Sequence, residues 1–212
     1  MVAGRKETTA TTMAEDVVNE GACAPFDLLS EHECAEVVAE AKRVLPECHW
    51  KKSLHEKGER CRAIAADERI TSIVKKALGT EDVIVWGTYL VEKAAGQNHR
   101  WHADCESQRW ETINAWIPLT NVGKESYMSY IPRSHKYPMQ CQDVVPRGLW
   151  ECDDAGALAF AKENYDENAT IERWKDMKVG QVAIKNANCW HATINTTAQP
   201  RQALLVQYCR YS

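Results

Sequence analysis

From residue 82 onward, the chain consists of short runs of β-branched and aromatic residues that are separated by turn-forming residues. The runs cover residues 83–91, 113–119, 127–131, 182–184 and 203–208. The second and third runs alternate in character, which is the period of a strand with one buried face. A long succession of short strands divided by turns predicts a β-sandwich or a β-barrel.

The residues before this β-rich part show helical periodicity instead. Ser30 and Glu33 form a capping box, and apolar residues follow them at helical spacing. A second helix is expected over residues 67–78, where apolar side chains recur on one face before a glycine. We therefore expect a helical segment over residues 30–79 that leads into the strands.

The length of 212 residues fits one domain, which we expect over residues 23–212. Residues 1–22 are rich in Thr, Ala and charged residues without a sustained apolar period, so they predict a mobile tail. An insertion at about residues 137–174 interrupts the strands and carries a predicted helix over residues 154–162. An insertion of this length is typical of a lid or of a wall that shapes a substrate pocket.

Composition excludes several classes of protein. Lys plus Arg number 26 against 30 for Asp plus Glu, and a net charge of −4 argues against nucleic-acid or anionic-membrane partners that are held by bulk positive charge. No apolar run approaches the roughly 18 residues of a membrane helix, and the first residues lack the apolar core of a signal peptide. The nine cysteines include no C-x-x-C pair, so we expect reduced thiols in a cytoplasmic protein.

The most informative motif is Trp101-His102-Ala103-Asp104. Side chains at positions i and i+2 of a strand point to the same face, so His102 and Asp104 can offer a nitrogen and an oxygen to one point. His191, after the run at 182–184, can add a second imidazole. Two histidines and one carboxylate leave three positions open on a metal, as in non-haem Fe(II) oxygen chemistry. Taken alone, His102 and Asp104 are more simply a salt-linked pair at a strand end.

Arg201 is separated from His191 by a turn-rich segment over residues 194–200. If this segment is a hairpin, the two side chains lie nearly opposite each other on neighbouring strands. A planar guanidinium binds a carboxylate through two parallel hydrogen bonds, so Arg201 can hold one end of an anionic co-substrate that chelates a metal with its other end. Taken alone, Arg201 is an exposed strand arginine, and only the combination with the histidines favours a site.

From about Phe26 to Tyr208, the chain resembles the phytanoyl-CoA dioxygenase-like (PhyH) family of iron(II)/2-oxoglutarate oxygenases. The segments that carry the resemblance are Lys93-Ala94-Ala95-Gly96, Trp101-His102-Ala103-Asp104, Ile131-Pro132-Arg133-Ser134-His135-Lys136 and Lys178-Val179-Gly180-Gln181-Val182. The resemblance implies a mostly β fold with flanking α-helices, namely a cupin-like double-stranded β-helix or jelly roll over about residues 82–212.

The resemblance also implies the chemistry of the site. His102, Asp104 and His191 are expected to bind Fe(II), and Arg201 to bind the far carboxylate of 2-oxoglutarate. Further positions that contact this co-substrate in the family are matched by Trp116, His135 and Thr193. The implied reaction uses O2 and converts 2-oxoglutarate to succinate while oxidising, and most simply hydroxylating, an unactivated C–H bond. The alternatives are a non-catalytic jelly-roll protein that holds a metal such as zinc, and an iron oxygenase that does not use 2-oxoglutarate.

Some positions depart from the family pattern, and one separates reaction types. Arg133 and Ser126 stand where glycine is usual, and Gln181 replaces the usual aspartate, so turn geometry is in question there. Halogenases that resemble this pattern carry a small residue in place of Asp104, so the carboxylate favours hydroxylation, desaturation or ring formation over chlorination. The expected substrate is a small polar or amphipathic metabolite such as an amino-acid derivative. Candidates to pair its anionic group are Arg100, Arg109 and Arg133.

Overall fold

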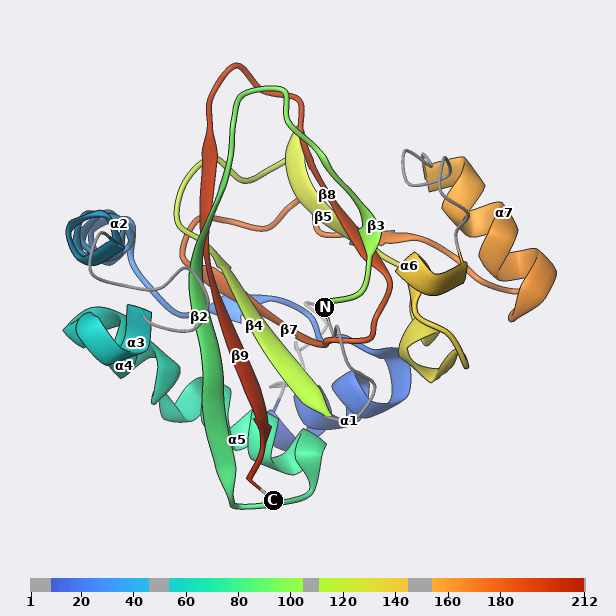
Figure 1. Cartoon of the computed structure of the whole chain (residues 1–212), viewed down its shortest axis with the longest axis horizontal. Coiled ribbons are helices and arrows are strands. Elements are labelled where there is room, and N and C mark those ends of the chain that lie inside the picture. Colours follow the sequence, from blue (N-terminus) through green and yellow to red (C-terminus); the bar gives the residue numbers. More distant parts are fainter. Residues whose placement is uncertain (1–8, 46–53, 105–110, 145–153, 212) are drawn as a thin grey trace, which may run out of the picture.

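The computed structural model describes residues 9–45, 54–104, 111–144 and 154–211, in which two antiparallel sheets face each other (Figure 1). The larger sheet has the order β1 (Phe26–Asp27), β7 (Gln181–Asn186), β4 (Thr112–Pro118), β9 (Arg201–Arg210), β2 (Val83–Lys93). The smaller sheet has the order β3 (His99–His102), β8 (His191–Asn195), β5 (Ser126–Tyr130), β6 (Glu172–Arg173). The five runs expected to be strands are confirmed as β2, β4, β5, β7 and β9, and β1, β3, β6 and β8 are further strands.

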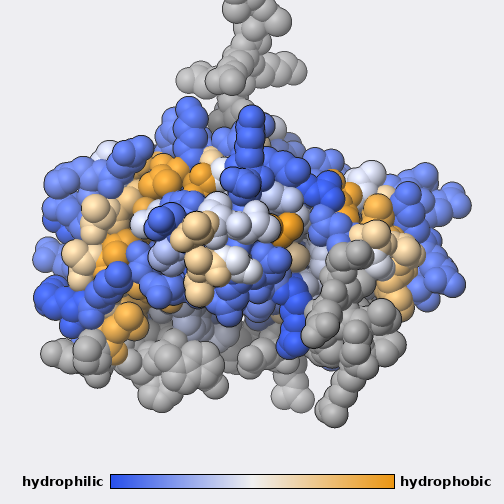
Figure 2. All heavy atoms as spheres, turned by 90° about the horizontal axis from the view of Figure 1, so that it is seen from above, coloured by the Kyte–Doolittle hydropathy of each residue, from blue (hydrophilic) through white to orange (hydrophobic). Residues whose placement is uncertain are grey.

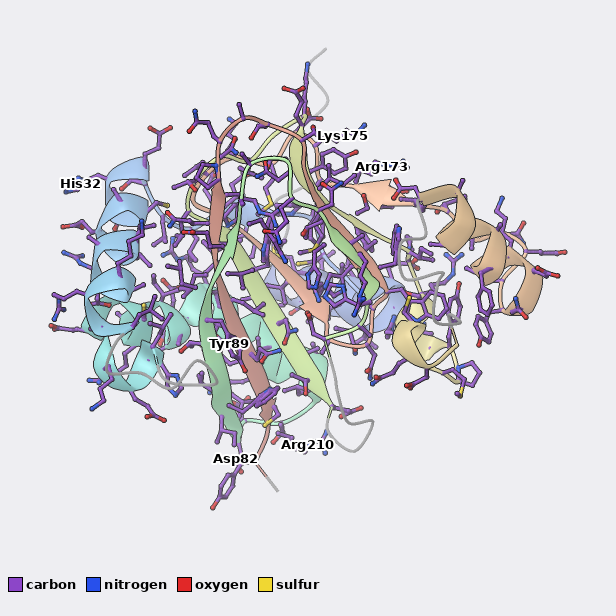
Figure 3. The ribbon with its side chains drawn as sticks, turned by 45° about the horizontal axis from the view of Figure 1, so that its top comes forward. His32, Asp82, Tyr89, Arg173, Lys175 and Arg210 are labelled. Carbon is purple, nitrogen blue, oxygen red and sulfur yellow. The ribbon has the colours of Figure 1, made fainter. Side chains whose placement is uncertain are left out.

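Helices flank both ends of this sandwich (Figure 1). The N-terminal helices are α1 (Ala10–Glu20), α2 (Glu31–Val44), α3 (Leu54–Lys57), α4 (Glu59–Ala65) and α5 (Glu68–Leu78). The helices of the insertion are α6 (Cys141–Val144) and α7 (Asp154–Asn164). The capping box of α2 and the predicted helices at α5 and α7 are confirmed. Arg173 on β6 forms an ion pair of 2.6 Å with Asp154, which fastens the start of α7 to the edge of the smaller sheet (Figure 3).

The pleat of the larger sheet separates an apolar face from a face that carries polar groups. Along β4, Ile113, Ala115 and Ile117 are buried in one cluster with residues of α1, α2 and α5. Asn114 and Trp116 point the other way, toward the smaller sheet, because neighbouring residues of a strand face opposite sides. The inner face of the larger sheet therefore carries polar side chains, such as Asn114, which reaches Asp104 across the interior.

Residues 10–20 form α1, which differs from the mobile tail expected over residues 1–22. Thr9 caps the helix, and Gly21, with a φ of 89°, ends it. Ala14 and Val17 are buried in the cluster that the helices share with the larger sheet. Ala10 and Met13 are partly buried against the same cluster, so the apolar positions of α1 do recur at helical spacing and the mobile tail expected there is wrong; packing against α5 stabilises the helix.

The strands β8 and β9 do not form the hairpin that the turn-rich segment predicted. β8 pairs with β3 and β5, whereas β9 pairs with β2 and β4. The segment between them carries the chain from one sheet to the other, so the register partner of Arg201 is Lys93 on β2. His191 and Arg201 consequently belong to different sheets, and Arg201 reaches Thr193 of β8 across the interior of the sandwich.

At Arg133 and Gln181, which depart from the family pattern, other interactions support the turns. Arg133 adopts the left-handed conformation with a φ of 65°, which favours glycine, and its guanidinium forms ion pairs with Glu20 and Asp166 at 3.3 Å and 2.9 Å. Gln181 accepts a hydrogen bond of 3.0 Å from the backbone N–H of Lys178 across the turn. Arg133, a candidate for pairing the substrate, is thus engaged in linking α1 to the segment after α7.

Within the described ranges, no helix is both long enough and apolar enough to cross a membrane. The face seen in Figure 2 is mostly hydrophilic, and its apolar side chains form small, separate groups. The described cysteines at positions 23, 34, 61, 141, 189 and 209 are buried. Cys48, Cys105, Cys152 and Arg109 lie outside the described residues.

We predict that Gly180→Ala lowers the free energy of unfolding more than Gly96→Ala. Both glycines have a positive φ, so each alanine brings a backbone penalty of roughly 1–2 kcal/mol. A Cβ at Gly180 would also collide with the backbone oxygen of Leu29, whereas one at Gly96 meets no atom within 4 Å. The collision should add about 1–3 kcal/mol, measured by urea unfolding. Equal losses in the two variants would contradict the close approach of this turn to Leu29.

Candidate metal centre

The structure brings the three predicted metal ligands together at one point of the interior. His102 ends β3 and is the register partner of His191 at the start of β8. Asp104 is held beside them by a hydrogen bond of 2.8 Å from its backbone N–H to the carbonyl of Ala187. One ligand atom from each side chain lies within 4.8 Å of the other two. Such a group can hold a metal ion while leaving further coordination positions open.

Both histidines present the same ring nitrogen to this point. The Nδ1 atom of His191 lies 2.9 Å from the carbonyl of Cys189, and that of His102 lies 2.7 Å from the carbonyl of Arg100. A backbone carbonyl only accepts, so Nδ1 carries the proton and Nε2 keeps its lone pair. Burial lowers the pKa of His191 to about 4, with Lys185 adding to the effect, so this imidazole is neutral and able to bind metal near neutral pH.

The carboxylate of Asp104 lies between the two imidazoles. Its Oδ1 is 3.3 Å from Nε2 of His102, and its Oδ2 is 3.5 Å from Nε2 of His191. Burial alone would raise the pKa of Asp104, but the ammonium of Lys185, with a further contribution from the neighbouring imidazoles, holds it well below its usual range. Asp104 is therefore ionised at any pH at which the histidines are neutral, as a metal ligand must be.

Arg201 is a buried cation on the same interior face, with a side chain only 1% exposed. One guanidinium nitrogen donates to Oγ1 of Thr193 at 3.0 Å, and the carbon of the group lies 5.5 Å from the ring centre of Trp116. The Nε atom is buried without a hydrogen-bond partner, and the described residues place no carboxylate within ion-pair distance. Burial lowers the pKa of Arg201 to about 10, which still leaves it charged at neutral pH.

A buried charge with unused donors is costly unless an opposite charge joins it. Arg201 therefore fits an anionic group, and its location links that group to the metal site. His191 and Thr193 are two residues apart on β8, so their side chains share one face. An anion bound to Arg201 and Thr193 would thus lie on the same side of the strand as the three ligands.

The family resemblance suggests three residues that contact the co-substrate, and the structure places two of them beside Arg201 and the third elsewhere. Trp116 and Thr193 surround the guanidinium of Arg201. The ring of His135 packs instead against the C-terminal end of α1, where Nε2 lies 3.0 Å from the carbonyl of Val18. The close approach of this ring to Gly21 fixes its place on the helix side of the turn.

Sequence reasoning missed three basic residues of the interior. His99 lies with its ring centre 4.0 Å from that of His102, and burial lowers its pKa to about 3. Lys93, the register partner of Arg201, has a lowered pKa because of burial and of the neighbouring guanidinium. Lys185 contacts Asp104. The role of Lys185 could have been suspected from the sequence. Its position falls on the buried face of an otherwise apolar strand, and a buried lysine requires an anionic partner.

A jelly roll whose interior holds two histidines, one carboxylate and a buried arginine defines the class of non-haem iron oxygenase folds. The family comparison agrees with this class. The model of the family described as Phytanoyl-CoA dioxygenase (PhyH) matches residues 18–203, and the chain belongs to this family. No curated protein matches the sequence.

Solved structures of low sequence identity share the fold. The epimerase SnoN, in complex with Fe3+, α-ketoglutarate and nogalamycin RO, gives a TM-score of 0.72 at 19% identity over 95% of this chain and 83% of that chain. HygX from Streptomyces hygroscopicus, with nickel and 2-oxoglutarate bound, gives 0.64 at 13% over 91% and 83%. EctD from S. alaskensis in its apoform gives 0.69 at 19% over 93% and 75%. The predicted double-stranded β-helix with flanking helices is confirmed.

We predict that the metal-free protein loses stability as the pH falls from about 6.5 to about 4. The pKa values of His99 and His191 in the fold, about 3 and about 4, lie below the ordinary value of 6.5. In this window the unfolded chain binds protons that the folded chain does not, so the free energy of unfolding decreases. Urea unfolding at a series of pH values measures the slope.

The variant His99→Gln should flatten this decline, because it removes one of the buried histidines that must gain a proton. His32→Gln is the matched control, since the His32 side chain is 83% exposed. A wild-type profile that is flat from pH 6.5 to 4, or a slope that changes equally in the two variants, would contradict the burial of His99.

Proposed function

We propose that the protein is an Fe(II)/2-oxoglutarate-dependent dioxygenase that oxidises an unactivated C–H bond of a small-molecule metabolite, most simply by hydroxylation. The observation that carries the proposal is the convergence of three metal ligands beside a buried arginine with an unpaired donor. His102, Asp104 and His191 would hold the metal. Arg201 and Thr193 would hold the far carboxylate of 2-oxoglutarate, with Trp116 as a wall of that subsite.

The residues fit both groups on chemical grounds. Two neutral imidazoles and one carboxylate suit a divalent iron and leave three coordination positions, which a chelating 2-oxoacid and O2 require. The chemistry that bound Fe(II) supplies is the activation of O2, coupled to decarboxylation of 2-oxoglutarate to succinate. The chain contributes orientation and exclusion of water, and the fully buried Ala183, which lies in the interior cluster with Trp116, supports that role.

The alternative of a non-catalytic metal-binding protein is less well supported. A closed structural site needs four protein ligands. Among the described residues the group that could hold a metal has three members. A 2-oxoglutarate-independent oxygenase would not need a buried cation next to the metal ligands, and Arg201 argues against it. The structural neighbours include an epimerase, a carbocyclase and a monooxygenase. Asp104 favours hydroxylation, desaturation or ring formation over chlorination, and analysis of the product distinguishes among them.

The substrate we propose is a polar or amphipathic metabolite, such as an amino-acid derivative. Its proposed place is the part of the interior beyond Asp104, on the side away from Arg201. Asn114 lies there, on the inner face of β4, and is buried. The Oδ1 atom of Asn114 is buried without a hydrogen-bond partner, so it can accept a hydrogen bond from a hydroxyl or amino group of a substrate.

Anaerobic addition of Fe(II) and 2-oxoglutarate should produce a visible charge-transfer band in the wild-type protein. His191→Ala should abolish the band because a metal ligand is lost. Arg201→Ala should weaken 2-oxoglutarate binding by about 10- to 100-fold, which corresponds to the loss of charged hydrogen bonds worth about 1.5–3 kcal/mol. The matched controls are His32→Ala and Arg173→Ala, whose side chains lie on the outside of the fold. A wild-type protein without the band and without succinate formation in air would refute the proposed function.

Screening metabolites, amino-acid derivatives among them, for stimulated succinate release should identify a substrate. Hydroxylation predicts a product that is heavier by one oxygen atom, and this atom should derive from labelled O2 when mass spectrometry is used to follow it. A product of unchanged composition would instead indicate epimerisation, and loss of two hydrogens would indicate desaturation or ring formation. Either result would leave the metal and co-substrate assignments in place and overturn hydroxylation.

A further inference from the structure

Lys185 is the most unusual group in the interior that the proposed chemistry does not use. It lies on β7, where Val182 and Ile184 face the helices, so the pleat turns Ala183 and Lys185 toward the space between the sheets. The Lys185 side chain is only 1% exposed. An ammonium in such a place is stable only with an anionic partner.

That partner is Asp104. The Nζ atom of Lys185 lies 2.5 Å from Oδ2 of the carboxylate. Asn114 is the register partner of Lys185 on β4, and its Nδ2 donates to the same Oδ2 atom at 2.8 Å. Two donors from the larger sheet thus converge on one oxygen of Asp104. The other oxygen, Oδ1, faces Nε2 of His102 at 3.3 Å.

A second contact of Lys185, to Nδ1 of His191 at 3.4 Å, is weaker. That nitrogen lies 2.9 Å from the carbonyl of Cys189, to which it donates. It therefore has no lone pair to offer an ammonium. The arrangement assigns Lys185 to the carboxylate and not to the imidazole.

We propose that Lys185 is a positioning residue of the metal centre, which acts with Asn114 to hold Oδ2 of Asp104 so that this carboxylate serves as a one-oxygen ligand. The inference rests on the proposed function, because it takes Asp104 as a metal ligand. It adds to that function a device that keeps a coordination position open for 2-oxoglutarate.

The physical reason is competition for Oδ2. A carboxylate can bind a cation through one oxygen or through both. Binding through both would occupy a position that the co-substrate needs. A charged donor and an amide donor on Oδ2 oppose this mode, since the metal would have to displace two hydrogen bonds. The ammonium also repels a nearby cation, so the device lowers metal affinity while it favours the co-substrate.

The test is Lys185→Met, which removes the charge and the donor but keeps an unbranched side chain. We expect changes of opposite sign in the two binding constants. Co(II), used as the probe metal, should bind several-fold more tightly because a like charge is gone and both oxygens are free. The Co(II)-loaded variant should bind 2-oxoglutarate about tenfold more weakly. Calorimetry measures both constants, and the visible spectrum of Co(II) reports the altered coordination.

Gln207→Met is the matched control. Gln207 is the register partner of Asn114 on β9, so it lies in the same row of the inner face and is similarly buried. Neither Co(II) nor 2-oxoglutarate affinity should change in this variant by more than about twofold, which is within the usual effect of a substitution away from the site. A change as large as that of Lys185→Met would mean that any substitution in this row of buried residues has the same effect, and it would overturn the positioning role.

Asn114→Ala keeps the inference testable if Lys185→Met does not fold. It removes the neutral donor only, so 2-oxoglutarate should bind more weakly while Co(II) affinity does not increase. A loss of affinity for both ligands in Lys185→Met, or no change in either, overturns the inference. If the wild-type Co(II) protein does not bind 2-oxoglutarate at all, the proposed function has failed. If the wild type binds it and Lys185→Met binds it equally well, only the positioning role has failed.

Discussion

Side chains from both sheets contact the carboxylate of Asp104. Imidazoles from β3 and β8 approach it from the smaller sheet, and donors from β4 and β7 approach it from the larger one. The hydrogen bond from its backbone to Ala187 ties the end of β3 to the turn after β7. Because all of these contacts converge on one group, the relative placement of the sheets and the geometry of the candidate metal centre are set together.

The charges of this interior are unbalanced in a way that matches the proposed co-substrate. Arg201 and Lys185 are almost fully buried, and Lys93 is partly buried, whereas Asp104 supplies a single negative charge among these groups. A divalent metal would increase the positive excess. A low-dielectric interior with this excess attracts an anion of charge −2 strongly, which is the charge of 2-oxoglutarate at neutral pH. The arrangement therefore favours a dianion over a neutral ligand before any shape is considered.

Strands, the capped helices and the three metal ligands could be predicted because each leaves a local signal, such as the H-x-D spacing at His102. Three features could not. The helix at residues 10–20 has a short apolar pattern, and its stability comes from contacts with α5 that this pattern alone does not report. The separation of β8 and β9 into different sheets is a property of topology, since the turn before Arg201 suits a hairpin equally well. Lys185 gains its role only when Asp104, distant in sequence, is placed beside it.

The helix α1 has a practical consequence for work on shortened forms of the protein. A chain cut at residue 23, where the sequence suggests that order begins, would lose the Glu20 carboxylate that pairs with Arg133 and the Val18 carbonyl that accepts from His135. It would also uncover the apolar side of α5 that Val17 packs against. Such a product is expected to aggregate in a cell lysate, so gene designs for this family member should retain the segment from Thr9.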